Sequence, residues 1–135
     1  MRRQQNTGRG FAHLSQKKYE EAFVDLNRAS RLLPDDAQAH FCRGLAYLDL
    51  HKYEEALMDF NKTLELNSVH VQAYNNRGIV YHNLKNYDQA LQSYTKAIQL
   101  NPKYAEAYLD RARLYLALGD SEKAAQDEES AAKLP

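Results

Sequence analysis

The sequence predicts an all-α fold of stacked helical units, and three observations carry this prediction. Residues 71–104 can be laid over the residues that lie 34 positions before and after them. Glycine, alanine and tyrosine recur at the same places in successive copies. Apolar residues within a copy follow the helical period. A fixed repeat of this length indicates units that cannot bury their apolar faces alone, so that stacking must provide the core.

Residues that share a position in successive copies are small, aromatic or aliphatic. Gly10, Gly44 and Gly78 share one position with Ala112, and Ala22, Ala56, Ala90 and Ala124 share another. Further positions hold Tyr19, Tyr53 and Tyr87, then Leu32, Leu66, Leu100 and Leu134, and then bulky Leu26, Phe60 and Tyr94. Pro34 and Pro102 stand at unit ends. This pattern resembles the tetratricopeptide repeat family, whose 34-residue unit is a pair of antiparallel helices.

The resemblance covers nearly the whole chain and implies a right-handed α-α superhelix. It implies one domain over residues 1–135, with units at 3–36, 37–70, 71–104 and 105–135. In this family small residues lie where two helices cross, which gives a structural role to Gly44, Ala56, Gly78 and Ala90. The resemblance says little about the ligand, because function resides in sites added to a fold.

In unit one, the first helix is expected at 3–16 and is weakened by Gly8 and Gly10. A better helix is expected at 19–33. Pro34 ends it, and the aspartates that follow supply an N-cap for the next helix.

Units two and three are the most regular, with helices expected at 37–50, 53–66, 71–84 and 87–100. Asn101 and Pro102 end the last of these. Unit four keeps its first helix, at 105–118, followed by a turn at Gly119. In its second helix Glu128 stands where Phe60 and Tyr94 stood, so the stack is expected to end in a solvated helix.

Composition places the chain among ordinary globular domains and excludes several classes of partner. The chain has 135 residues, 44% of them apolar, and equal numbers of basic and acidic side chains, 18 of each. No overall field therefore attracts nucleic acid or an anionic membrane. The charge is nevertheless graded, from +2 over residues 1–36 to −3 over residues 105–135.

Cys42 is the only cysteine, so no internal disulfide can form and a reducing compartment is expected. No apolar run approaches the roughly 18 residues of a membrane span, and the first residues lack the apolar segment of a secretory signal. We therefore expect a cytoplasmic or nuclear location.

The sequence offers no catalytic or metal site. The five histidines occupy five different positions of the repeat unit, and no nucleophile motif or phosphate-binding loop is found. We expect no enzymatic activity, no cofactor and no metal. Nine of the ten tyrosines occupy recurring core columns, which favours a structural role over an aromatic binding surface.

A column of arginines, Arg9, Arg43, Arg77 and Arg111, lies within the apolar stripe of the first helices. A buried charge needs a partner. Asp25, Asp59 and Asp127 recur in the second helices, while Ser93 takes that place in unit three. We expect half-buried Arg–Asp pairs, with Arg43 and Asp59 as the first. The alternative is that each arginine extends its head group to solvent.

The candidate binding site is the concave face, which in this family is lined by the first helices. It is expected to present Phe41, Leu45, Asn75, Asn76, Ile79, His82, Leu109, Asp110 and Arg113. The apolar members would receive apolar side chains of an extended peptide, the asparagines would hydrogen-bond its main chain, and Arg113 would take an acidic group. The alternative is that these residues only close the curve of the superhelix.

The partner is expected to be a protein or peptide. Some family members bind the acidic C-termini of chaperones through groove cations. At the matching positions of units two to four, only Asn76 fits, and Glu106 and Asp110 stand where cations are needed. We therefore predict against acidic chaperone tails as ligands. A second hypothesis is self-association, in which copies stack end to end with basic unit one on acidic unit four.

Overall fold

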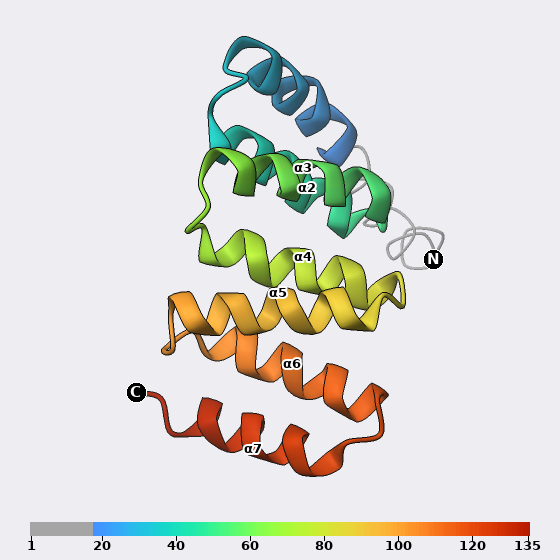
Figure 1. Ribbon diagram of the computed structural model, residues 1–135. Helices are drawn as coiled ribbons and strands as arrows, with labels where there is room; N and C mark the ends of the chain where they lie inside the picture. Colours follow the sequence, from blue (N-terminus) through green and yellow to red (C-terminus); the bar gives the residue numbers. More distant parts are fainter. Residues whose placement is uncertain (1–17) are drawn as a thin grey trace, which may run out of the picture.

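The computed structural model describes residues 18–135, and this part of the chain is helical and has no strand. Residues 18–32 form the first described helix. It is followed by α2 (Ala37–Asp49), α3 (Tyr53–Leu66), α4 (Val71–Asn83), α5 (Tyr87–Leu100), α6 (Ala105–Ala117) and α7 (Ser121–Ala132) (Figure 1). The bounds predicted for helices in this range agree to within one residue. The helix predicted at 3–16 lies outside the described residues.

The first helices of units two, three and four each end one residue earlier than predicted, and the cause is the same each time. Leu50, Leu84 and Leu118 are C-caps rather than helical residues. The residue after each cap has a positive φ, of 59° at His51, 63° at Lys85 and 81° at Gly119. This left-handed conformation reverses the chain so that the second helix of each unit runs back along the first. Glycine adopts it without a steric penalty, whereas His51 and Lys85 do not.

Side chains cap the starts of three helices. The Asp36 carboxylate accepts a hydrogen bond from the Gln38 backbone N–H at 3.0 Å, which confirms the predicted cap of α2. Asp120 does the same for α7, accepting from the Lys123 N–H at 3.1 Å. At α4 the cap is His70, whose Nδ1 accepts from the Ala73 N–H at 3.1 Å.

Each unit is a helix pair, and the pairs stack. α2 packs on α3, α4 on α5 and α6 on α7, while α3 contacts α4 and α5 contacts α6. First helices of successive units also meet, α2 with α4 and α4 with α6, whereas α3, α5 and α7 do not touch one another. The first helices therefore lie closer together and form the concave side of the stack. The predicted fold class, an all-α superhelix of antiparallel helix pairs, is confirmed.

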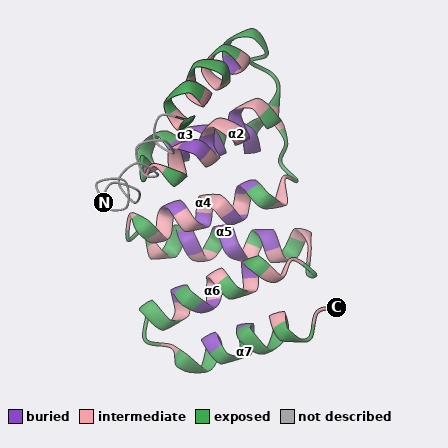
Figure 2. Cartoon of the chain, turned by 180° about the vertical axis from the view of Figure 1, so that it is seen from behind, coloured by how far each residue is buried: buried purple, intermediate pink, exposed green. Residues whose placement is uncertain are grey.

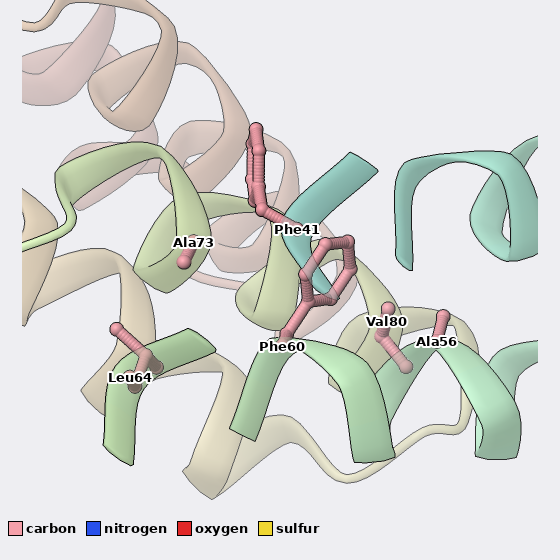
Figure 3. Packing of buried hydrophobic residues seen from close by; sticks show 6 residues of the cluster. All are labelled: Phe41, Ala56, Phe60, Leu64, Ala73 and Val80. Atoms are coloured by element: carbon pink, nitrogen blue, oxygen red, sulfur yellow. The ribbon is translucent and has the colours of Figure 1, made fainter. Parts of the chain in front are cut away.

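The core is continuous across units. Its larger cluster joins unit two to unit three and consists of Phe41, Ala56, Phe60, Leu64, Ala73 and Val80 (Figure 3). A smaller cluster of Ala90, Tyr94 and Leu114 joins unit three to unit four. Figure 2 shows that buried residues become sparse in α7, which is mostly exposed. The prediction of a solvated last helix is confirmed.

The small residues predicted at helix crossings lie in close contacts. Ala56 and Ala90 are 0% exposed. A β-carbon on Gly44 would lie 2.7 Å from Cε1 of Phe60, which is closer than packed atoms approach. Only glycine allows the Phe60 ring to cross α2 at this distance. The recurring glycine and the recurring bulky residue are therefore two halves of one contact.

Candidate functional site

The candidate site is the inner face of the stack, by which we mean the exposed surface of α2, α4 and α6 on its concave side. These helices lie side by side because α4 contacts both of the others. Backbone geometry fixes their spacing, so side chains at equivalent positions form rows that cross the three helices. An elongated partner lying across these rows would touch all three units.

Two of the predicted groove residues are buried and unavailable to a ligand. Phe41 is only 4% exposed, and its ring lies 4.5 Å from the His70 ring and 5.8 Å from the Phe60 ring. Asn75 is 2% exposed and donates from Nδ2 to the Asp110 carboxylate at 3.0 Å. Both were predicted to face the groove, and this was wrong. Asn75 is covered by Asp110 of the following unit, whereas Phe41 packs on Phe60 of its own partner helix and on His70, the N-cap of α4.

Leu109 holds the position in unit four that Phe41 and Asn75 hold in units two and three, but it is exposed. It is 42% exposed, because no further unit covers α6 in the described part of the chain. Leu116 of α6 and its C-cap Leu118 are also exposed, whereas their counterparts, Leu48 of α2 and its C-cap Leu50, are half-buried. The end of the stack at α6 and α7 therefore carries apolar side chains that are covered in the units before it.

The predicted residues that are not fully buried, and so remain candidates for the inner face, include Leu45, Asn76, Ile79, His82, Asp110 and Arg113. Leu45 and Ile79 are half-buried, since each packs against a core cluster with part of its side chain. Asn76 Nδ2 donates to the Gln72 backbone carbonyl at 2.8 Å, one turn earlier in α4. This bond uses one of the two amide N–H groups, so Asn76 offers a ligand its carbonyl oxygen as an acceptor and its second N–H as a donor.

Charged groups gather where α4 meets α6. Asp110 accepts from Asn75 and also pairs with Arg113, whose Nη1 lies 2.9 Å from Oδ1. Burial raises the pKa of Asp110, while Asn75 and Arg113 act against that rise. Burial lowers the pKa of His82, and the Asp110 charge opposes this shift. Arg113 was expected to take an acidic group from a partner, but Asp110 of the chain itself fills that role.

Glu106 lies one turn before Asp110 in α6 and completes this group. Its carboxylate accepts a hydrogen bond from the Tyr104 hydroxyl at 3.1 Å. Burial, together with the Glu106 charge, raises the pKa of Tyr104 to about 12. Tyr104 therefore remains a neutral donor to the Glu106 carboxylate.

The predicted ladder of Arg–Asp pairs is present. Arg43 donates from Nε and Nη2 to the two oxygens of Asp59 at 2.8 and 2.7 Å, and Arg111 binds Asp127 at the same distances. Hydrogen bonding to these carboxylates raises the pKa of both arginines. Arg77 instead donates to Ser93 Oγ at 3.1 Å. The ladder ties the first helices, which form the inner face, to the second helices of the same units.

Each arginine of the ladder also reaches the unit before it. Arg43 Nη1 donates to Asn27 at 3.0 Å, and Arg77 Nη1 donates to Asn61 at 3.1 Å. Arg111 Nη1 donates to Thr95 at 3.3 Å. These contacts between units were not predicted from the sequence. The recurrence of a polar residue 16 positions before each arginine is the signal that could have revealed them.

Residues 18–135 contain neither a metal site nor a membrane span. No three histidine, cysteine, aspartate or glutamate side chains converge there in a way that could hold a metal ion. None of the helices described is long and apolar enough to cross a bilayer.

Comparison with protein-family models identifies the repeat. Models described as tetratricopeptide repeats match residues 37–68, 71–104 and 93–126, and one described as a TPR repeat matches residues 10–51. The chain belongs to the tetratricopeptide repeat family. The resemblance drawn from the sequence is thereby confirmed. A comparison by sequence with curated proteins finds no match.

Solved tetratricopeptide repeat structures share the fold. A structure titled "Crystal structure of MamA" is 23% identical with a TM-score of 0.80, and the match covers 92% of this chain and 72% of that one. MamA from Desulfovibrio magneticus RS-1 is 19% identical with a TM-score of 0.81, covering 93% and 71%. The second TPR of Spaghetti (RPAP3), bound to the HSP90 peptide SRMEEVD, is 26% identical with a TM-score of 0.69, covering 73% and 92%.

Proposed function

We propose that this chain is a non-enzymatic interaction module that holds an extended peptide or a partner helix on its inner face. The observation that supports the proposal is that α4 contacts both α2 and α6, and that these helices carry half-buried Leu45 and Ile79 and the acceptor of Asn76. The peptide-bound RPAP3 structure, in a similar tetratricopeptide repeat, supports this use of the fold. We include in the proposal a single domain of four units.

Three features make the inner face suited to an elongated ligand. Its apolar groups are partly covered already, so that a ligand need bury only their tips to gain from the contact. The Asn76 carbonyl can accept from a main-chain N–H whatever the side chains of the ligand are. The helices that carry these groups are fixed by the Arg–Asp ladder behind them, which limits the entropy lost on binding.

A random peptide library displayed on phage tests the proposal. Panning on the immobilised chain should enrich peptides that bind it, and the best of these would be synthesised. Asn76→Ala removes the acceptor and should weaken binding about tenfold, the usual effect of one lost hydrogen bond to a ligand. Gln92→Ala, at an exposed position of α5 away from the inner face, is the matched control.

The result that would count against the proposal is a failure to enrich any peptide, or peptides that bind Asn76→Ala and wild type equally well. Circular dichroism should show the same melting curve for Asn76→Ala and Gln92→Ala. A difference in binding between them then reports the site and not the fold.

A second candidate function is assembly end to end, and the exposed leucines of α6 favour it. Leu109, Leu116 and Leu118 lie where a following unit would pack. The acidic charge of residues 105–135 would face the basic charge of residues 1–36 in a neighbouring copy. Sedimentation of the wild type and of Leu116→Ser at tens of micromolar tests this. A monomeric wild type excludes assembly at that concentration.

A further inference from the structure

The inner face of α6 carries two carboxylates on one side of the helix. Glu106 and Asp110 are four residues apart, so their side chains lie one turn above the other. Like charges at this spacing repel each other and destabilise the helix that carries them. Nothing in the α6 backbone requires both to be acidic. The pair is a cost to the free protein, and a cation between them would remove it.

Arg113 compensates only part of this charge. It pairs with Asp110 through a single short contact of 2.9 Å, and its side chain is 73% exposed. Asp110 is only 14% exposed, but solvent screens the exposed guanidinium, which also loses conformational freedom in the pair, so Arg113 is held weakly. Two carboxylates against one guanidinium leave one net negative charge on this part of the inner face. A ligand cation can displace the Arg113 head group without disturbing the fold.

A buried amide holds Asp110 in position from below. Asn75 is 2% exposed and donates to Asp110 Oδ2 at 3.0 Å. Its own Oδ1 is buried and has no partner among residues 18–135. A buried polar atom without a partner is costly, so the placement of Asn75 under Asp110 is not explained by the stability of the core. What Asn75 does achieve is to fix the direction in which the carboxylate points.

The surroundings leave the Asp110 carboxylate poorly compensated. Burial is the largest cause of the raised pKa of Asp110, and the neighbouring Glu106 charge adds to it. His82 of α4 faces the same carboxylate, but burial lowers its pKa and so favours its neutral form. Among the described residues the free protein therefore gives Asp110 only Arg113 as a permanent cation.

We propose that the inner face binds a lysine or arginine side chain of its partner between Glu106 and Asp110, so that the preferred ligand is a basic segment. This inference rests on the proposed function of the inner face and specifies the chemistry of the partner. Main-chain and apolar contacts would come from Asn76, Leu45 and Ile79, and the charge from α6. Acidic ligands would meet two carboxylates at this place and be rejected.

The peptide selection described above tests the charge of the ligand directly. Peptides enriched on the wild type should contain more lysine and arginine than the starting library. The best synthetic peptide should lose about tenfold or more in affinity on Glu106→Gln combined with Asp110→Asn, because one side of a charge pair is removed. The matched control is Glu122→Gln combined with Glu129→Gln, which makes the same charge change on exposed positions of α7. Affinity for this control should stay within about twofold.

The outcomes separate this inference from the function on which it rests. Enriched peptides that lose affinity on Asn76→Ala but carry no excess of basic residues would overturn the basic-ligand inference and leave the interaction function standing. Unchanged affinity after neutralising Glu106 and Asp110 would overturn it in the same way. If no peptide is enriched at all, both proposals fail. Melting curves of the two double variants verify that each remains folded.

Discussion

A β-carbon on Gly78 would lie 2.5 Å from Cε1 of Tyr94 and 2.6 Å from Cδ1. Tyr94 is 1% exposed and is held by the core that joins units three and four, so its ring cannot move aside easily. Intrinsic helix propensity favours alanine over glycine by about 1 kcal/mol. The contact with Tyr94 predicts instead that alanine at position 78 destabilises the protein. Gly78→Ala should lower the free energy of unfolding by about 1–3 kcal/mol, the typical cost of overpacking, as measured by urea denaturation.

A double-mutant cycle is the control for this effect. In a Tyr94→Leu background the ring edge is absent, and Gly78→Ala should then cost much less or become stabilising. Equal costs in both backgrounds would mean that the ring is not the cause. Unit four already combines the two changes: Ala112 takes the position of Gly78, and Glu128 takes the position of Tyr94.

Ala90 tests the second column of small residues. It is 0% exposed, at a close approach of helices in units three and four. Ala90→Leu adds three carbon atoms there and should cost about 1–3 kcal/mol, seen as a lower midpoint of thermal unfolding. The matched control is Ala125→Leu at an exposed position of α7, which should leave the midpoint nearly unchanged. A normal midpoint for Ala90→Leu would show that this contact is not tight.

The helices and the ladder could be predicted from the sequence because each depends on residues within one unit. The apolar period sets the helices, and the arginine and aspartate columns lie in one helix pair, 16 residues apart for Arg43 and Asp59. Both follow from local spacing. The same is true of the cap at Asp36.

The inner face was predicted less well because it depends on neighbouring units. Counting along a single helix puts Phe41 and Asn75 away from its apolar stripe, and on that ground alone they would be exposed. In the structure His70, the N-cap of α4, packs against Phe41, and Asp110 of unit four covers Asn75. Position within one helix cannot show this. Leu109 remains exposed only because the described chain has no unit beyond it.

Asp59 tests the ladder. Its side chain is 5% exposed and holds the guanidinium of Arg43 through two hydrogen bonds. Asp59→Ala leaves a half-buried arginine without its anion and should cost about 3 kcal/mol, near the lower end for a broken buried pair. Glu128→Ala removes an exposed carboxylate of α7 and should have little effect in the same denaturation experiment. Equal effects would show that the pair contributes little.

Ser93 offers the reverse experiment. Arg77 binds Ser93 and Asn61, and its guanidinium lies 5.2 Å from the centre of the Tyr74 ring, but it has no carboxylate partner among the described residues. Ser93→Asp recreates the arrangement seen at Asp59 and Asp127. It should raise the free energy of unfolding by about 1 kcal/mol, as a charge-assisted hydrogen bond replaces a neutral one. Ser93→Asn, which adds similar volume without charge, separates the ion pair from packing. Destabilisation by the aspartate alone would contradict the prediction.

His70 makes the stability of the stack depend on pH. It caps α4 through Nδ1, which must be unprotonated to accept from the Ala73 N–H, and its ring packs on Phe41. Burial lowers the pKa of His70 in the folded protein. The folded state therefore binds fewer protons than the unfolded state, in which histidine titrates near pH 6.5, at about its ordinary pKa. The stabilisation is complete above that pH and is lost as the pH falls toward the lower folded value.

The variant that isolates this effect is His70→Asn, because asparagine also caps helices but does not titrate. Thermal midpoints measured between about pH 7.5 and pH 5, the range in which histidines change charge, should fall less steeply for His70→Asn than for the wild type. His82, whose pKa burial also lowers, should account for part of the remaining slope, and His82→Asn measures that part. Exposed Gln92→Ala, which removes no titratable group, is the control and should follow the wild type. Parallel curves for the wild type and His70→Asn would show that the cap does not titrate in this range.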